Sequence, residues 1–123
     1  MLAPFNIYNR SQGTLVASEA KLARTIWDRT RGLIGRPSLQ EGEALILTPC
    51  SGVHMIGMRY DILAAYLDRH GIVLGLVRLR PGTLGPNMAG TRAVIEMPPS
   101  MIDPVRVGDH LLWCLSSRRI QVV

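Results

Sequence analysis

The sequence is short of several residue types. It holds one lysine, Lys21, against thirteen arginines, and six aromatic residues among 123. Its cysteines, Cys50 and Cys114, lie far apart without paired-ligand spacing, so we expect two free, buried thiols rather than a disulfide framework or a metal motif. No window approaches the roughly 20 apolar residues that a transmembrane helix needs. The first residues lack the basic start and apolar run of a signal peptide, which favours a cytoplasmic location.

Arginine is the residue type present in excess. The formal net charge is +5, with a pI near 10.0. Guanidinium forks bind phosphate and carboxylate bidentately, so the excess is consistent with an anionic ligand, and equally with a solvated basic surface in a GC-rich genome. The arginines are scattered, and no aromatic residues are interleaved among them as on a single-strand binding surface. Specific nucleic-acid binding is therefore not expected.

Length and composition predict one domain over residues 1–123. The chain is 47% hydrophobic and 19% charged, which is typical of a folded globular protein. A domain of this size buries a core without disulfides or metals, so neither a cofactor nor a structural metal is expected. Because aromatic residues are few, the core must consist mainly of Leu, Ile, Val and Met.

Short apolar runs separated by turn residues predict a chain made mostly of strands. The predicted strands are 5–8, 14–17, 44–48, 62–67, 72–79, 93–97, 110–115 and a last one at 120–123. One amphipathic helix is expected over 26–34, between a Thr25 cap and the helix-ending Gly35 and Pro37. The predicted fold class is α+β, mainly β: a small antiparallel barrel or sandwich flanked by one or two helices.

The link between two of these strands, Asp68-Arg69-His70-Gly71, has turn chemistry and predicts a hairpin. In the second arm, the two-residue period places Arg78 and Arg80 on one face, opposite Val77 and Leu79. A glycine- and proline-rich stretch follows at 81–91 and predicts a long exposed loop.

Four motifs occur in a fixed order: Arg31-Gly32-Leu33-Ile34-Gly35-Arg36, the segment 54–68, Ile95-Glu96-Met97-Pro98 and Val107-Gly108-Asp109. Together they resemble the bacterial and archaeal domain of unknown function 192, also called uncharacterised protein family 0127, over about residues 22–113. The resemblance implies a compact, mostly β, barrel-like fold with a flanking helix. It implies no assigned activity.

One departure from the family pattern concerns the start of the strand at 62–67. The resemblance leads us to expect a proline followed two residues later by an acid, whereas this chain has Asp61-Ile62-Leu63. Residues 61 and 63 leave an extended chain on the same face, about 6–7 Å apart. Either Asp61 partly replaces the family carboxylate, or the associated function has lapsed in this member.

The main functional hypothesis is a small binding or accessory domain with a pocket for an anionic ligand. The candidate ligand-binding residues are Arg59, Arg78, Arg80, His54 and Asp61, around the segment 50–61 and the loop 81–91. Guanidinium forks and loop amides would bind a phosphate, a carboxylate or an acidic sugar.

Two alternatives remain open. A small hydrolase-like enzyme would use His54, Asp61 and Glu96 for acid and base chemistry. Glu96 has a structural interpretation too, because a carboxylate on an apolar strand needs a partner such as Arg31. Cys50 and His54 could instead form a nucleophile and its base, although no orienting group is specified.

The second alternative is a protein-interaction module that presents its basic face to a protein partner.

Overall fold

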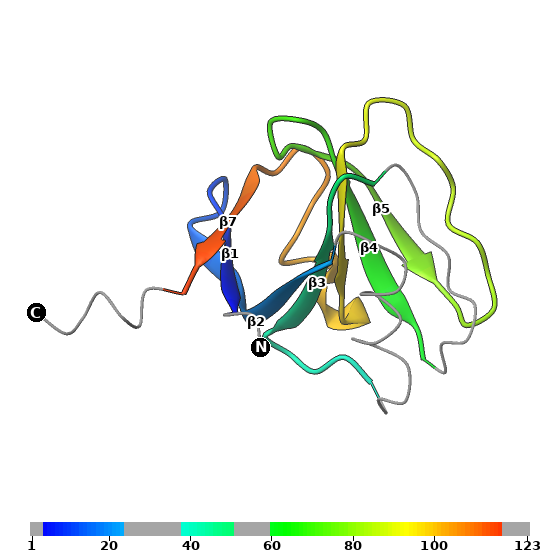
Figure 1. Cartoon of the computed structure of the whole chain (residues 1–123), viewed down its shortest axis with the longest axis horizontal. Helices are drawn as coiled ribbons and strands as arrows, with labels where there is room; N and C mark the ends of the chain where they lie inside the picture. Colours follow the sequence, from blue (N-terminus) through cyan, green and yellow to red (C-terminus); the bar gives the residue numbers. More distant parts are fainter. Residues whose placement is uncertain (1–3, 24–37, 51–59, 117–123) are drawn as a thin grey trace, which may run out of the picture.

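The computed structural model describes residues 4–23, 38–50 and 60–116. These residues form one seven-stranded sheet in the order β5-β4-β6-β3-β2-β1-β7 (Figure 1). The strands are β1 (Phe5–Asn9), β2 (Thr14–Ala23), β3 (Glu43–Leu47), β4 (Ile62–Leu67), β5 (Val73–Leu79), β6 (Ala93–Met97) and β7 (Leu111–Leu115). A single-turn 3-10 helix, η1 (Pro99–Ile102), follows β6.

The mainly β prediction is confirmed, and two strands, β4 and β6, have the bounds predicted for them. The strands form one sheet, so the sandwich alternative is not observed. One detail was wrong: the sheet is mixed rather than antiparallel, because β2 pairs in parallel with β3. The expected flanking helix is not confirmed: residues 26–34 and the last predicted strand lie outside the described residues, in which η1 is the one helical element.

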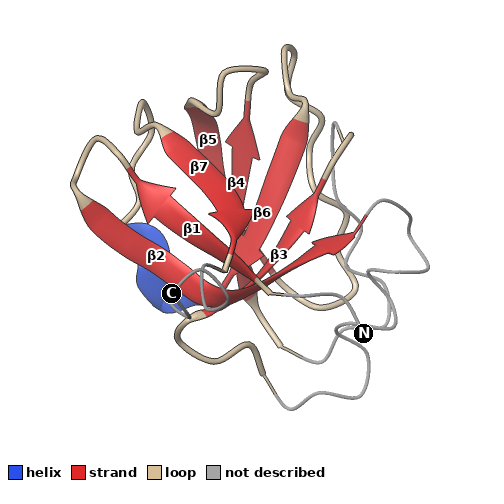
Figure 2. Cartoon of the chain, turned by 60° about the vertical axis from the view of Figure 1, so that its left-hand side comes forward, coloured by secondary structure: helices blue, strands red, loops and turns tan. Residues whose placement is uncertain are grey.

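The sheet is curled, so that its two outermost strands meet at one end (Figure 2). Ile72 and His110 form an antiparallel bridge between the start of β5 and the start of β7. Backbone bonds from the Val73 amide to Asp109 and from the Gly108 amide to Val73 extend this contact, at 2.9 and 2.8 Å. We call residues 71–73 and 108–111 the seam. The seam makes the sheet a partial barrel, which agrees with the barrel alternative of the prediction.

All six residues of β4 are buried. Because side chains alternate along a strand, β4 contributes to two apolar clusters, one on each face of the sheet. The interior cluster contains Leu63, Ala65 and Leu67 and draws residues from all seven strands, so it fills the inside of the curl. The outer cluster contains Ile62, Ala64 and Tyr66 and lies on the other face of β3, β4, β5 and β6. A strand buried on both faces explains the unbroken apolar run in the sequence.

The predicted hairpin between β4 and β5 is confirmed. Asp68 accepts hydrogen bonds through Oδ1 from the amides of His70 and Ile72, at 2.8 and 3.0 Å. Gly71 has a φ of 84°, which favours glycine. The bond from the Ile72 amide, helped by that from His70, holds the pKa of Asp68 below its ordinary value although desolvation opposes it.

Within the described ranges, no helix is long and apolar enough to cross a membrane.

Candidate functional site

The best-defined charged contact at the predicted site joins Asp61 and Arg78. The Arg78 guanidinium donates through Nε to Asp61 Oδ2 at 3.3 Å, and its Nη2 lies 3.3 Å from the same oxygen. The Arg78 side chain is 63% exposed and the Asp61 side chain 31% exposed. Since only one carboxylate oxygen is engaged, this is not the bidentate geometry of a strong pair, and solvent screens it.

Arg80 lies two residues further along and is exposed. By the strand period it leaves on the same face as Arg78, about 6–7 Å away. The prediction that Val77 and Leu79 face the other way is confirmed, because both pack with the outer cluster. In the described part of the chain, the Arg80 guanidinium has no side-chain partner.

A tight turn holds the start of the 81–91 loop against Arg80. Thr83 donates to the Arg80 carbonyl through both its amide and its hydroxyl. Gly82, with a φ of 78°, completes the turn. Most of the loop is exposed, as predicted, although the Met88 side chain packs back over Gly75 of β5. The loop therefore begins directly after Arg80, and its Thr83 amide is already bonded to the Arg80 carbonyl.

The departure from the family pattern has a structural counterpart here. Leu63 is directly opposite Arg78 in the β4–β5 register, and it is buried in the interior cluster. A carboxylate at position 63 would lie across from Arg78, whereas in this chain Asp61 reaches that guanidinium from the end of the strand. Asp61 thus gives Arg78 a carboxylate partner. Whether it replaces the family carboxylate stays a prediction.

Glu96 lies on the opposite face. It is fully buried in β6, between Leu45 of β3 and Ala64 of β4 in the register. Tyr66 and Cys50 belong to the same surroundings: burial, then the nearby Cys50 and Glu96, raise the pKa of Tyr66 to about 12. The Tyr66 hydroxyl is buried and has no hydrogen-bond partner in the part of the chain that the structure describes. Titratable groups therefore gather within an otherwise apolar cluster.

The residues proposed for hydrolysis are not all brought together. Asp61 bonds Arg78 on the interior-cluster face, whereas Glu96 lies on the outer-cluster face. His54 and Arg59 lie outside the described residues, as does Arg31, the suggested partner of Glu96. A shared acid and base site at Asp61 and Glu96 would therefore have to span the sheet.

The cysteines are free, as expected, but the prediction that both are buried was wrong for Cys114, which is exposed. Cys50 is half-buried at the edge of the outer cluster. Cys114 is exposed because β7 is an edge strand and its outer face is uncovered there. Over residues 4–23, 38–50 and 60–116, no three His, Cys, Asp or Glu side chains gather as a metal site.

Asp109, from the last of the four sequence motifs, is bonded into the seam. It is 6% exposed. Its Oδ2 accepts from Asn9 Nδ2 at 2.8 Å and from the Arg106 amide at 3.0 Å, and Gln12 Nε2 lies 3.5 Å from Oδ1. Burial alone would raise the pKa of Asp109, but these donors hold it below its ordinary value. This carboxylate links β1 to the turn before β7.

Sequence reasoning missed two features. Tyr66 was treated only as part of an apolar run, although a lone tyrosine among aliphatic residues signals a hydroxyl that needs surroundings of its own. It also missed a hollow on the outer face of β1, lined by Tyr8 and Arg10. That hollow brings together residues from both ends of the chain, so no local motif could have indicated it.

The fold and the charged site define a small β-rich domain, a partial barrel with Arg78 and Arg80 exposed at one end of the β4–β5 hairpin. Its sequence matches the family model DUF192, described as "Uncharacterized ACR", over residues 7–113. The chain therefore belongs to the domain of unknown function 192 family. It is also similar to a UPF0127 protein of Thermococcus sibiricus, with 28% identity over 119 residues, covering 92% of this chain and 77% of that protein.

Two solved structures share the fold. One is a protein of unknown function from Novosphingobium aromaticivorans, with a TM-score of 0.72 and 21% identity over 89% of this chain and 84% of its own. The other, described as a proposed transcription regulator, comes from Sinorhizobium meliloti, with a TM-score of 0.72 and 14% identity over 89% of this chain and 91% of its own. At these identities the likeness concerns the fold alone.

Proposed function

We propose that this domain binds a small multivalent anion at the rim formed by Asp61, Arg78, Arg80 and the turn at Thr83. One observation supports this proposal: two arginines lie side by side and neither is fully engaged. Arg80 is exposed and has no side-chain partner in the described chain, and Arg78 is bonded to a single carboxylate oxygen of Asp61. An anion would bridge the two guanidinium groups and accept from the loop amides.

Asp61 has a defined role in this mechanism. It keeps Arg78 in place when no ligand is bound, and it competes with the ligand for the guanidinium. An anion with two charged groups gains most, because the two arginines are about 6–7 Å apart along the strand. Binding needs no covalent step, so His54 and Glu96 have no required part in it.

The test is an NMR titration with pyrophosphate and with citrate at low ionic strength. We expect saturable amide shifts at residues 61–62 and 78–84. Arg80→Gln should weaken binding about tenfold, the loss expected for one charge-assisted contact. Arg69→Gln is the matched control, because it removes the same charge from the exposed turn at the other end of the hairpin.

The Asp61→Asn variant tests whether this carboxylate competes with the ligand for Arg78. If Asp61 only competes for Arg78, this variant should bind pyrophosphate more tightly than the wild type. Equal weakening by Arg80→Gln and Arg69→Gln would show that only net charge matters, and the proposal would then be wrong. Absence of saturable shifts at residues 78–84 with either anion would also overturn it.

A further inference from the structure

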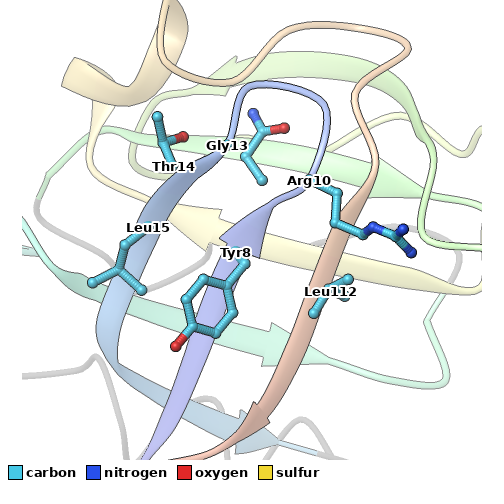
Figure 3. A pocket seen from close by; sticks show the side chains of 7 residues that line it. Tyr8, Arg10, Gly13, Thr14, Leu15 and Leu112 are labelled. Atoms are coloured by element: carbon cyan, nitrogen blue, oxygen red, sulfur yellow. The ribbon is translucent and has the colours of Figure 1, made fainter.

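A partly exposed apolar surface lies on the outer face of β2, β1 and β7. Leu15, Tyr8 and Leu112 lie opposite one another in register across these three strands. They line an open hollow of about 470 Å³, together with Arg10 and Gly13. Figure 3 shows the three apolar side chains in a row, with Arg10 on the same side beyond Leu112.

The apolar row is not a by-product of the core. Ile7 and Leu111, the neighbours of Tyr8 and Leu112, already face the interior cluster. By the strand period the row points outward, where an antiparallel sheet is usually polar. Leu15 is nevertheless 53% exposed and Tyr8 37% exposed. These strands therefore carry apolar residues on both faces, and the outer set contacts solvent.

Arg10 gives this hollow its charge. It is exposed at the end of β1, and its amide donates to the His110 carbonyl at 2.8 Å, which fixes its backbone beside β7. No acidic residue lines the hollow. In the described part of the chain, the guanidinium of Arg10 has no side-chain partner.

The geometry points to a site for a small arylalkyl carboxylate, a molecule with an apolar body and one carboxylate. The body would cover Leu15, Tyr8 and Leu112, and the carboxylate would pair with the Arg10 fork. The hollow is open to solvent, so the molecule would lie against the sheet rather than be enclosed. The site is independent of the anion rim at Arg78 and Arg80, because it uses different strands and requires an apolar group.

The probe is 4-phenylbutyrate, titrated into the protein and followed by amide and side-chain NMR shifts. We expect saturable shifts at residues 8–15 and 111–113. Two comparison probes separate the contributions: 4-phenylbutanol lacks the charge, and butyrate lacks the ring. Each should bind at least about tenfold more weakly than 4-phenylbutyrate, because each loses one of the two contacts.

Two variants test the residues. Arg10→Gln should weaken 4-phenylbutyrate about tenfold, and Leu15→Glu should weaken it more, because it removes apolar area and adds repulsion. Their controls are Arg69→Gln and Ile102→Glu, since Ile102 is 51% exposed and does not line the hollow. All four positions are exposed, so the fold should survive each change.

Three outcomes would overturn this inference. They are shifts that do not saturate, equal binding of acid and alcohol, and shifts centred on residues 78–84, which would assign the probe to the anion rim. Conversely, 4-phenylbutyrate could bind at residues 8–15 even if pyrophosphate fails at Arg80, so the two proposals fail separately.

Discussion

The seam and the rim lie at opposite ends of the β4–β5 hairpin, and each holds an aspartate. At the seam, Asp109 is 6% exposed and accepts from Asn9, Gln12 and the Arg106 amide. At the rim, Asp61 is 31% exposed and bonds Arg78 through one oxygen. A buried carboxylate needs donors, whereas an exposed one can exchange its partner. The seam carboxylate therefore serves stability, and the rim carboxylate is available for recognition.

The largest effect that would sharpen this comparison is expected at Gly71. A Cβ there would collide with the Leu111 carbonyl oxygen, and the residue has a φ of 84°. Backbone strain of about 1–2 kcal/mol and a clash of about 1–3 kcal/mol should add, so we expect Gly71→Ala to lose about 2–5 kcal/mol in urea unfolding.

Gly82→Ala, at the rim, is the control for Gly71→Ala. It has a φ of 78°, but a Cβ there meets no atom within 4 Å. It should lose only the same backbone term of about 1–2 kcal/mol. Equal losses in the two variants would mean that the close approach across the seam contributes nothing.

Removing the seam charge should have the next largest effect. Asp109→Asn replaces one accepting carboxylate oxygen with an amide NH2 group, which then faces donors that need an acceptor. We therefore expect a loss of about 2 kcal/mol in unfolding free energy at pH 7. Asp103→Asn, at an exposed position, should stay within about 0.5 kcal/mol of the wild type. A seam held only by its backbone bonds would give equal values for both.

The same variant predicts a pH dependence. Because the folded pKa of Asp109 is lowered, its contribution is complete above the unfolded pKa of about 3.9 and is lost as pH falls through the folded pKa. The difference between wild type and Asp109→Asn should therefore shrink between pH 5 and the acid limit of folding. A constant difference across urea titrations at several pH values would contradict this linkage.

At the rim the expected loss of stability is smaller. Asp61→Asn should change the unfolding free energy by less than about 1 kcal/mol, because its pair with Arg78 is exposed and uses one oxygen. Thermal or urea unfolding in 0.05 and 0.5 M salt measures this directly. A larger loss would mean that the rim pair is structural, as at the seam, and would count against ligand exchange there.

Tyr66→Phe should have the smallest effect at neutral pH. Its hydroxyl is buried without a hydrogen-bond partner among the described residues, so its removal should leave stability unchanged or slightly raised. The raised pKa of about 12 means that wild-type stability is complete below pH 10 and is lost as pH rises through about 12. The variant should resist that alkaline loss, as circular dichroism would show. Tyr8→Phe, on the surface, should not.

The sequence was a good guide where one residue pattern decides the outcome. The run 62–67 is buried on both faces, and Asp68 with Gly71 makes the turn, so β4 and its hairpin were predicted correctly. The second half of β2 was missed because Ser18, Glu19 and Lys21 are poor strand formers, and all three are exposed there. Its parallel pairing with β3 depends on a crossover, which local patterns do not specify.

The site was predictable in part for the same reason. The common face of Arg78 and Arg80 follows from the period of one strand. The pairing of Asp61 with Arg78, and the separation of Asp61 from Glu96, depend on the register between strands. Two of the three donors to Asp109, Asn9 and Gln12, lie about 100 residues away in sequence. Contacts over that distance leave no signal in one sequence.

The pairing of β1 with β7 has a consequence for biosynthesis. Phe5 is opposite Leu115, so the first strand of the chain waits for the last described one before its outer edge is covered. A ribosome must therefore release residues 5–115 before β7 can pair with β1, and until then β1 exposes a strand edge to other chains. Slow, late closure makes the nascent domain dependent on protection against aggregation in a way that the finished partial barrel is not.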